Sequence, residues 1–280
     1  RVFDVDATTL TATPITNDLS LNSTALTDAI TADVAELANG NMVIAYDLLR
    51  ASKAADLAFR VIDDTGDEVI AETFVITGST VVTDSARYPA LVPLDDGGFV
   101  IAYFIGATTD VAELFGQRYD ASGAPVGSQF LISIGTGNVR YFVDATRLSN
   151  GNIAFTWYDY NLPNGNFSDI ALRIYTPGNG TPSAVTDVVM VNTVTTGLQF
   201  RPQIASFADG FIIVFDGPNY PGGNQFDIVY RLFANDGTPF GDDVRINTSV
   251  TGQQLQPVVA TGFLGRIGLL WQDGNSTSGD

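Results

Sequence analysis

The chain has 280 residues, 45% of them apolar, so it can bury a sizeable core. Its 13 basic and 31 acidic residues give a net charge of −18, which makes nucleic acid and anionic membranes poor partners. It has no cysteine and no histidine, which excludes disulfides, thiolate metal sites and a serine–histidine catalytic pair. No apolar run approaches the ~18 residues of a membrane span, so we expect no membrane insertion.

A turn glycine followed by an apolar run that ends in an aromatic residue occurs five times along the chain. The closing aromatic residues are Tyr46, Tyr103, Trp157, Phe215 and Trp271, at spacings of 57, 54, 58 and 56 residues. Such a period is longer than the ~20–30 residues of solenoid coils. It is also too short for immunoglobulin-type sandwiches, which need about 100 residues. The spacing therefore indicates an array of small sheets.

Each repeat is predicted to contain four strands. The first begins at a proline in three copies, Pro89, Pro202 and Pro257, where no ladder donor is needed. The second is the aromatic-ended run, the third carries an acidic residue near its start, and the fourth ends at a small polar residue. The second strands are apolar on both faces, as expected for sheets that pack face to face. The pattern predicts an all-β protein, a five-bladed β-propeller of four-stranded blades.

We expect one β-propeller domain over residues 1–280, with blades at 22–78, 79–134, 135–193 and 194–249. The last blade combines 250–280 with 1–21, because residues 1–4 match the third-strand pattern of residues 60–63. The N- and C-terminal strands would then complete one sheet and leave no exposed edge. A slice of a longer repeat array fits the same observation, and five blades would then be a lower bound.

The repeat is clearest over residues 87–133, with PxxxxLxDGGFVIAY at 89–103 and GQRYDASGAPVGSQF at 116–130. This stretch resembles the β-propeller-like repeats of large secreted, calcium-associated (RTX-type) bacterial proteins. The resemblance implies an extracellular or cell-surface module with no assigned catalysis. The glycine-rich calcium-binding nonapeptide of such proteins is absent, so the resemblance does not carry calcium binding over to this chain.

The loops between second and third strands lie on one face of a propeller and are rich in acidic residues. Paired carboxylates beside amide and backbone oxygens are ligands that Ca²⁺ prefers, so Ca²⁺ is the one cofactor that we consider. The alternative is that these acids end solvated loops or pair with Arg60, Arg173 and Arg231. The candidate calcium ligands are Asp47, Asp56, Asp159, Asp169, Asp216, Asp227, Asp273 and Asp280.

Two of these loops also carry aromatic and amide side chains, a combination typical of sugar sites. Trp157 is expected in the core, because its equivalents in the other repeats are also aromatic. The loop aromatics have no such equivalents, and we expect them to be exposed. The candidate ligand-binding residues are Tyr158, Tyr160, Asn161, Asn219 and Tyr220.

These features favour a non-enzymatic extracellular binding or adhesion module for a glycan or cell-surface ligand. We do not expect an enzyme, since the blades of catalytic propellers usually diverge and these repeats are alike. One alternative is a glycoside hydrolase or lyase that acts on polysaccharide, and another is a structural repeat unit of a long surface protein. For the enzyme, the candidate carboxyls are Asp33, Glu36, Asp95 and Asp144. Asp144 is the foremost of these, with a hydrogen-bonded channel residue as its alternative role.

Overall fold

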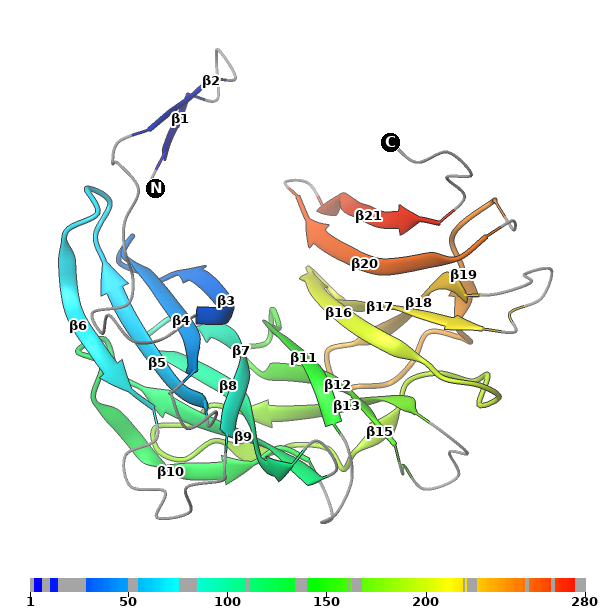
Figure 1. Cartoon of the computed structure of the whole chain (residues 1–280), viewed down its shortest axis with the longest axis horizontal. Coiled ribbons are helices and arrows are strands. Elements are labelled where there is room, and N and C mark those ends of the chain that lie inside the picture. Colours follow the sequence, from blue (N-terminus) through cyan, green and yellow to red (C-terminus); the bar gives the residue numbers. More distant parts are fainter. Residues whose placement is uncertain are drawn as a thin grey trace.

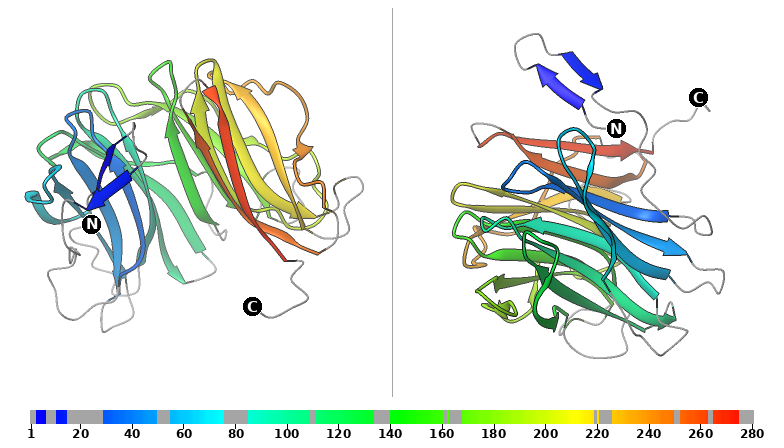
Figure 2. Two further views of the ribbon diagram at one scale, coloured as in Figure 1. Left: turned by 90° about the horizontal axis from the view of Figure 1, so that it is seen from above. Right: turned by 90° about the vertical axis from the view of Figure 1, so that its left-hand side faces the viewer.

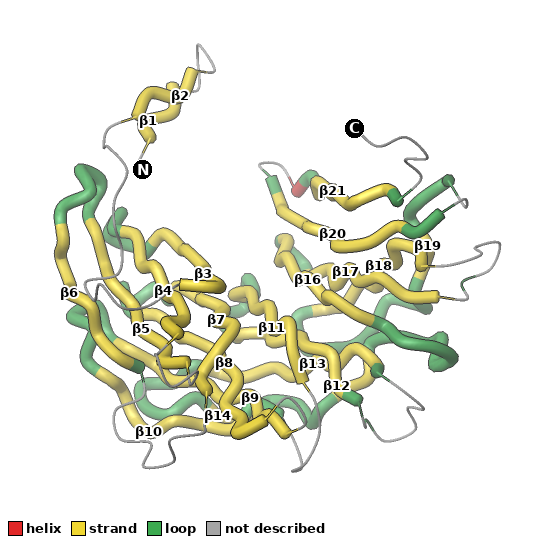
Figure 3. Tube along the Cα trace, viewed as in Figure 1, coloured by secondary structure: helices red, strands yellow, loops and turns green. Residues whose placement is uncertain are grey.

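The computed structural model describes residues 3–6, 11–14, 29–49, 55–75, 85–108, 111–133, 140–160, 162, 168–218, 220, 226–249, 252–262 and 265–274. Apart from one helical residue at Gly265, these residues form strands and loops, which confirms the all-β prediction (Figure 3). Over these ranges, no helix has the length and apolar character needed to cross a membrane.

Four sheets have their strands in chain order, each antiparallel to the one before it. The first contains β3 (Ala29–Glu36), β4 (Met42–Leu49), β5 (Ala55–Ile62) and β6 (Glu68–Phe74). The second contains β7 (Ser85–Pro93), β8 (Phe99–Thr108), β9 (Val111–Tyr119) and β10 (Pro125–Leu131). The third contains β11 (Arg140–Arg147), β12 (Ile153–Asp159) and β13 (Asp169–Thr176), with the short β14 (Ser183–Ala184) and β15 (Val189–Met190) both paired to β13. The fourth contains β16 (Phe200–Phe207), β17 (Gly210–Pro218), β18 (Phe226–Ala234) and β19 (Val244–Arg245).

The sheets follow one another around a common axis as an open arc (Figure 1). The first strands β3, β7, β11 and β16 lie toward the middle, and neighbouring sheets turn their faces toward each other (Figures 1 and 2). Each of these four sheets falls within one of the blade ranges expected from the repeat. The division of the chain into blades at these bounds stays a prediction.

The expected completion of the fifth sheet by the N-terminal strands is not formed. β20 (Gln254–Thr261) and β21 (Ile267–Asp273) make a two-stranded sheet, and β1 (Phe3–Asp6) pairs with β2 (Thr11–Pro14) in a separate hairpin. The hairpin and β21 lie on the two sides of the opening in the arc (Figure 1). Because β1 and β2 supply each other's ladder hydrogen bonds, neither depends on β21. The count of five blades stays a prediction.

The core lies between adjacent sheets, because the second strands are covered on both faces. All seven residues of β12 are buried. Trp157, Tyr46, Tyr103 and Phe215 are at most 1% exposed, which confirms the expected core position of Trp157. Burial of one such side chain contributes ~1.5–3 kcal/mol. The three largest interior clusters each join residues of two successive sheets, so these sheets stabilise one another.

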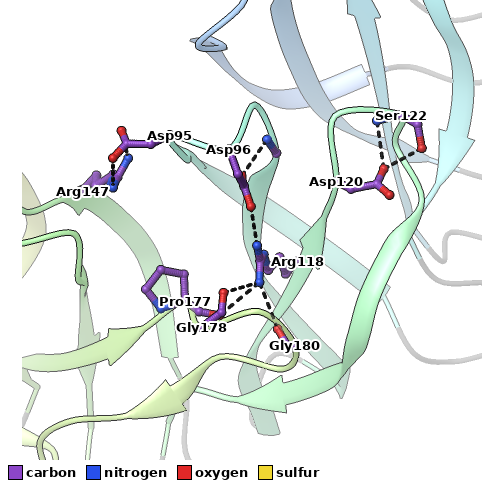
Figure 4. A network of polar contacts seen from close by, with 10 residues as sticks. Asp95, Asp96, Arg118, Asp120, Ser122, Arg147, Pro177, Gly178 and Gly180 are labelled. Atoms are coloured by element: carbon purple, nitrogen blue, oxygen red, sulfur yellow. Dashed lines mark hydrogen bonds and ion pairs between the residues drawn. The ribbon is translucent and has the colours of Figure 1, made fainter.

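Polar contacts at the turn end of the strands also join the second sheet to the third (Figure 4). The guanidinium of Arg118 bonds Asp96 in its own sheet and reaches the carbonyl oxygens of Gly178 and Gly180 in the third. Arg147 on β11 pairs with Asp95 in the turn between β7 and β8. Arg118 stands where Val61 and Ile174 occur in other repeats, so the repeat pattern gave no sign of this contact.

The turn glycines adopt the backbone that the sequence predicted. Gly40, Gly97 and Gly151 have φ of 86°, 84° and 85°, a region that strains other residues. In the shorter fourth hairpin, Gly210 is constrained by space instead, since a Cβ there would lie 2.1 Å from the Phe233 carbonyl oxygen.

Gly210→Ala is expected to destabilise the protein by ~1–3 kcal/mol, because the methyl group would push against the backbone of β18. Gly180→Ala is the matched control, since a Cβ at Gly180 meets nothing within 4 Å. The free energy of unfolding in urea measures both effects. Equal stability of the two variants would contradict the proposed close contact.

Candidate functional site

Asp33 and Asp144 occupy the same position of the repeat in the first and third sheets. Each lies seven residues before its turn glycine, from 33 to 40 and from 144 to 151. Asp33 pairs across the sheet with Ala45 on β4, and Asp144 pairs with Thr156 on β12. Since first strands line the middle of the arc, the two carboxyls lie on inner strands, on either side of β7 (Figure 1).

Each of these carboxyls bonds two successive sheets. Asp33 accepts the N–H of Val34 at 2.8 Å through Oδ1 and that of Leu91 on β7 at 2.7 Å through Oδ2. Asp144 accepts the N–H of Ala145 at 2.9 Å and that of Ile204 on β16 at 2.8 Å in the same way. Two aspartates thus satisfy the equivalent N–H groups of four first strands. This explains why the residue occurs in alternate sheets.

Burial controls the protonation of both groups. Desolvation raises the pKa of Asp144 to about 7, against the lowering effect of its two backbone hydrogen bonds, and the negative charge of Asp33 raises it further. Desolvation also raises the pKa of Asp33, although its backbone hydrogen bonds oppose the shift. Asp144 is therefore a carboxyl that titrates near neutral pH and responds to the charge of a second carboxyl.

Aromatic side chains contact one another near the register shifts of the first strands, in the second, third and fourth sheets. The rings of Tyr88 and Phe142 have centroids 6.1 Å apart, and those of Phe142 and Tyr158 are 5.9 Å apart. Tyr158 meets Phe200 at 5.3 Å, edge to face. Phe142 is 45% exposed, a large exposed apolar surface two residues from Asp144. An exposed ring beside a carboxyl suits a sugar.

A fully buried carboxyl lies where the fourth sheet meets the fifth. Asp216 is fully buried, and its Oδ2 accepts from Arg201 Nη1 at 2.7 Å and from the N–H of Gln256 on β20 at 3.0 Å. Desolvation raises the pKa of Asp216, while the hydrogen bonds and the charge of Arg201 oppose the shift. Arg201 therefore holds this acid and still exposes part of its guanidinium.

The acids expected to bind calcium mostly cap backbone and side chains. Asp169 Oδ1 accepts from Asn192 and Asp227 Oδ1 accepts from Asn247, both at 2.7 Å. Asp47 accepts the N–H of Thr31 at 2.7 Å. Within the described part of the chain, no group of three or more acidic side chains is placed to hold a metal ion. Calcium binding stays a prediction.

The remaining calcium candidates differ in their exposure to solvent. Asp159 is buried and accepts from Trp157 Nε1 at 3.3 Å. Asp56 is half-buried and Asp273 is exposed, while Asp280 lies outside the described residues.

The third-strand arginines bond partners other than those the sequence suggested. Arg173 donates to the Ile132 carbonyl at 3.0 Å, and Arg231 donates to the Val191 carbonyl at 2.6 Å. Each of these bonds reaches the preceding sheet. Arg60 pairs with Glu68 at 2.5 Å.

The aromatic residues predicted to bind a ligand are mostly buried, so the expectation of exposed rings is wrong for two of them. Tyr158 is 6% exposed within the aromatic row, and Tyr220 is 3% exposed, packs on Phe215 and donates to Asp243. Tyr160 is half-buried against Tyr158. Asn161 and Asn219 lie outside the described residues.

The sequence interpretation missed Phe142 and Arg201 on the inner strands. Alignment on the turn glycine could have found them, because both lie nine residues before it, as Tyr88 and Gln256 also do.

The fold is similar to that of solved structures of glycan-degrading enzymes. An α-L-arabinanase of Penicillium chrysogenum, complexed with arabinobiose, is 15% identical with a TM-score of 0.65 over 89% of this chain and 76% of that chain. The GH93 α-L-arabinofuranosidase of Fusarium graminearum is 15% identical with a TM-score of 0.62, over 86% and 74%. The Hadza microbial sialidase Hz136 is 11% identical with a TM-score of 0.57, over 86% and 52%.

The chain has a β-propeller fold. No protein-family model and no curated protein matches the sequence. The expectation of a non-enzymatic binding or adhesion module, and with it the expectation of no enzyme activity, is contradicted by the structural neighbours. The neighbours include arabinanases and arabinofuranosidases, and this is the finding that overturns it.

Stability is expected to fall as the pH rises from about 4 to about 7. Asp144 has a higher pKa in the folded chain than the ~3.9 of an unfolded aspartate, so unfolding releases a proton in this window. Asp33, Asp169 and Asp216 shift in the same direction. Unfolding free energy measured at pH 5 and pH 8 should be higher at pH 5.

Asp144→Asn should reduce this difference between pH 5 and pH 8. Asp95→Asn is the control, since the pKa of the exposed Asp95 is lowered by Arg147 and affects stability only at more acidic pH. An undiminished difference in Asp144→Asn would show that this carboxyl is not the group that titrates.

Proposed function

We propose that the protein is a glycoside hydrolase that cleaves arabinose-containing polysaccharide, with Asp144 and Asp33 as its catalytic carboxyls. The observation that carries the proposal is the pair itself: two carboxyls at one repeat position on inner strands, one with a pKa of about 7. The fold is shared with enzymes that act on arabinan or arabinofuranosides, which supports this substrate class. A polysaccharide substrate also fits the extracellular location expected from the sequence.

The chemistry of glycosidic cleavage requires two carboxyls with different protonation states. One acid protonates the leaving oxygen, while a second carboxylate acts at the anomeric carbon, directly or through a water molecule. Asp144 suits the acid, because desolvation keeps its proton up to about neutral pH. Asp33 suits the second role. Its carboxylate charge is also one of the causes that raise the pKa of Asp144.

Hydrogen bonding leaves room for substrate at both groups. Each carboxyl oxygen of Asp33 and Asp144 accepts one backbone N–H. A carboxyl has about four lone-pair positions, so each oxygen keeps capacity for a second contact. The backbone bonds fix the orientation of the carboxyls, which favours a catalytic role over a merely solvated one.

Asp144→Asn and Asp33→Asn are each expected to lower kcat on linear arabinan by at least about 100-fold, since each removes a proton-transfer or charged group. Released arabinose and arabinobiose measure the rate. Activity of the native protein should fall as the pH rises above about 7, because Asp144 then loses its proton.

Asp236→Asn is the matched control, an exposed carboxyl in the turn after β18 and away from the inner strands, and should keep the native rate. Circular dichroism of every variant verifies folding. Native activity in Asp144→Asn, or no cleavage of any arabinose-containing glycan by the native protein, would overturn the proposal.

A further inference from the structure

Four first strands share one unusual backbone position. Tyr88, Phe142, Arg201 and Gln256 have φ of 56°, 52°, 51° and 55°, in the left-handed region that favours glycine. Each lies where the pairing of the first strand with the second shifts register. Each is also followed by a buried residue, Pro or Val. The shift in register with this backbone conformation is a β-bulge. Since it recurs in four sheets, the fold itself requires a bulge at this position of the first strand.

The side chains at this position are unrelated to one another, although the backbone is constant. Glycine or asparagine would adopt this φ at lower cost, yet the four residues are tyrosine, phenylalanine, arginine and glutamine. Elsewhere the repeat keeps its residue type, as at the turn glycines and the closing aromatics. A costly residue that differs from sheet to sheet is retained for what its side chain contacts.

These side chains are accessible, and each lies two residues before the repeat position that Asp33 and Asp144 occupy. Phe142 is 45% exposed, Gln256 is exposed, and Tyr88 and Arg201 are half-buried. Tyr88 and Phe142 contact each other across the second and third sheets. Arg201 and the backbone of Gln256 meet on Asp216 across the fourth and fifth sheets. The four residues therefore form two pairs along the inner strands: an aromatic pair, Tyr88 with Phe142, and a polar pair, Arg201 with Gln256.

We propose that this set of bulge residues selects the glycan, with Phe142 and Tyr88 as the stacking platform for the sugar ring that binds beside Asp144. The inference rests on the proposed function and names the residues that would bind its substrate. A sugar ring has a flat apolar face that packs on an aromatic ring, and hydroxyl groups that bond amide and guanidinium groups. Phe142 supplies the first kind of contact, and Arg201 with Gln256 supplies the second to the next sugar along the chain.

Phe142→Ala is expected to weaken binding of arabinobiose about tenfold and to raise KM on arabinan by a similar factor. The value of kcat should change by less than about threefold, because the ring binds without taking part in proton transfer. Phe142→Tyr should restore both values, since it restores the ring. Isothermal titration calorimetry with arabinobiose gives the affinity, and initial rates on arabinan give KM and kcat.

Phe240→Ala is the matched control. Phe240 is 62% exposed and lies between β18 and β19, away from the inner strands, so its removal also deletes an exposed ring. Native affinity in Phe142→Ala, or an equal loss in Phe240→Ala, would overturn the inference.

The two proposals can fail separately. If the native protein binds arabinobiose and does not cleave arabinan, while Phe142→Ala loses binding, the platform is supported and the catalytic proposal fails. If cleavage occurs with unchanged KM in Phe142→Ala, the catalytic proposal stands and the platform is wrong. Absence of both binding and cleavage overturns both.

Discussion

The structure depends on how the inner strands satisfy backbone N–H groups that the sheets themselves leave unpaired. A buried N–H without a partner costs about 1–3 kcal/mol, and the register shift in each first strand creates such groups. Asp33 and Asp144 each supply one acceptor to their own sheet and one to the next. The aspartates therefore hold neighbouring blades at a fixed spacing. They do so from the inside of the arc, where no other strand is available to pair.

The hydrogen bonds of Asp144 to two successive sheets have a chemical consequence. Asp144 bonds two sheets and is thereby partly withdrawn from water, and this desolvation disfavours its charge and raises its pKa to about 7. The fold needs Asp144 for hydrogen bonding, and its pKa is thereby brought into the range where a general acid works best. The structural and the proposed catalytic roles do not compete. The same backbone bonds that join the blades also orient the carboxyl.

The repeat explains why the blades look alike and why they are not equivalent. Gly40, Gly97 and Gly151 share one backbone conformation, and the buried second strands share one packing arrangement. The residue types at these positions therefore stay constant. The bulge residues and the position of Asp144 lie on the inner strands, and their residue types differ from sheet to sheet. Differences confined to a few inner positions are compatible with enzymatic function. They are also hard to see against a strong repeat.

The sequence by itself determined the all-β architecture of repeated small sheets. Glycine spacing, closing aromatics and two-faced apolar strands predict stacked four-stranded sheets, because these patterns follow from local backbone geometry and burial. It also singled out Asp144. Only the tertiary structure decided that Asp33 and Asp144 make equivalent bonds to the next sheet, that Tyr220 is buried, and that the N-terminal strands pair with each other. The physical reason is that partners such as Asp144 and Ile204 lie 60 residues apart, and no local pattern specifies which side chain meets which backbone group across two blades.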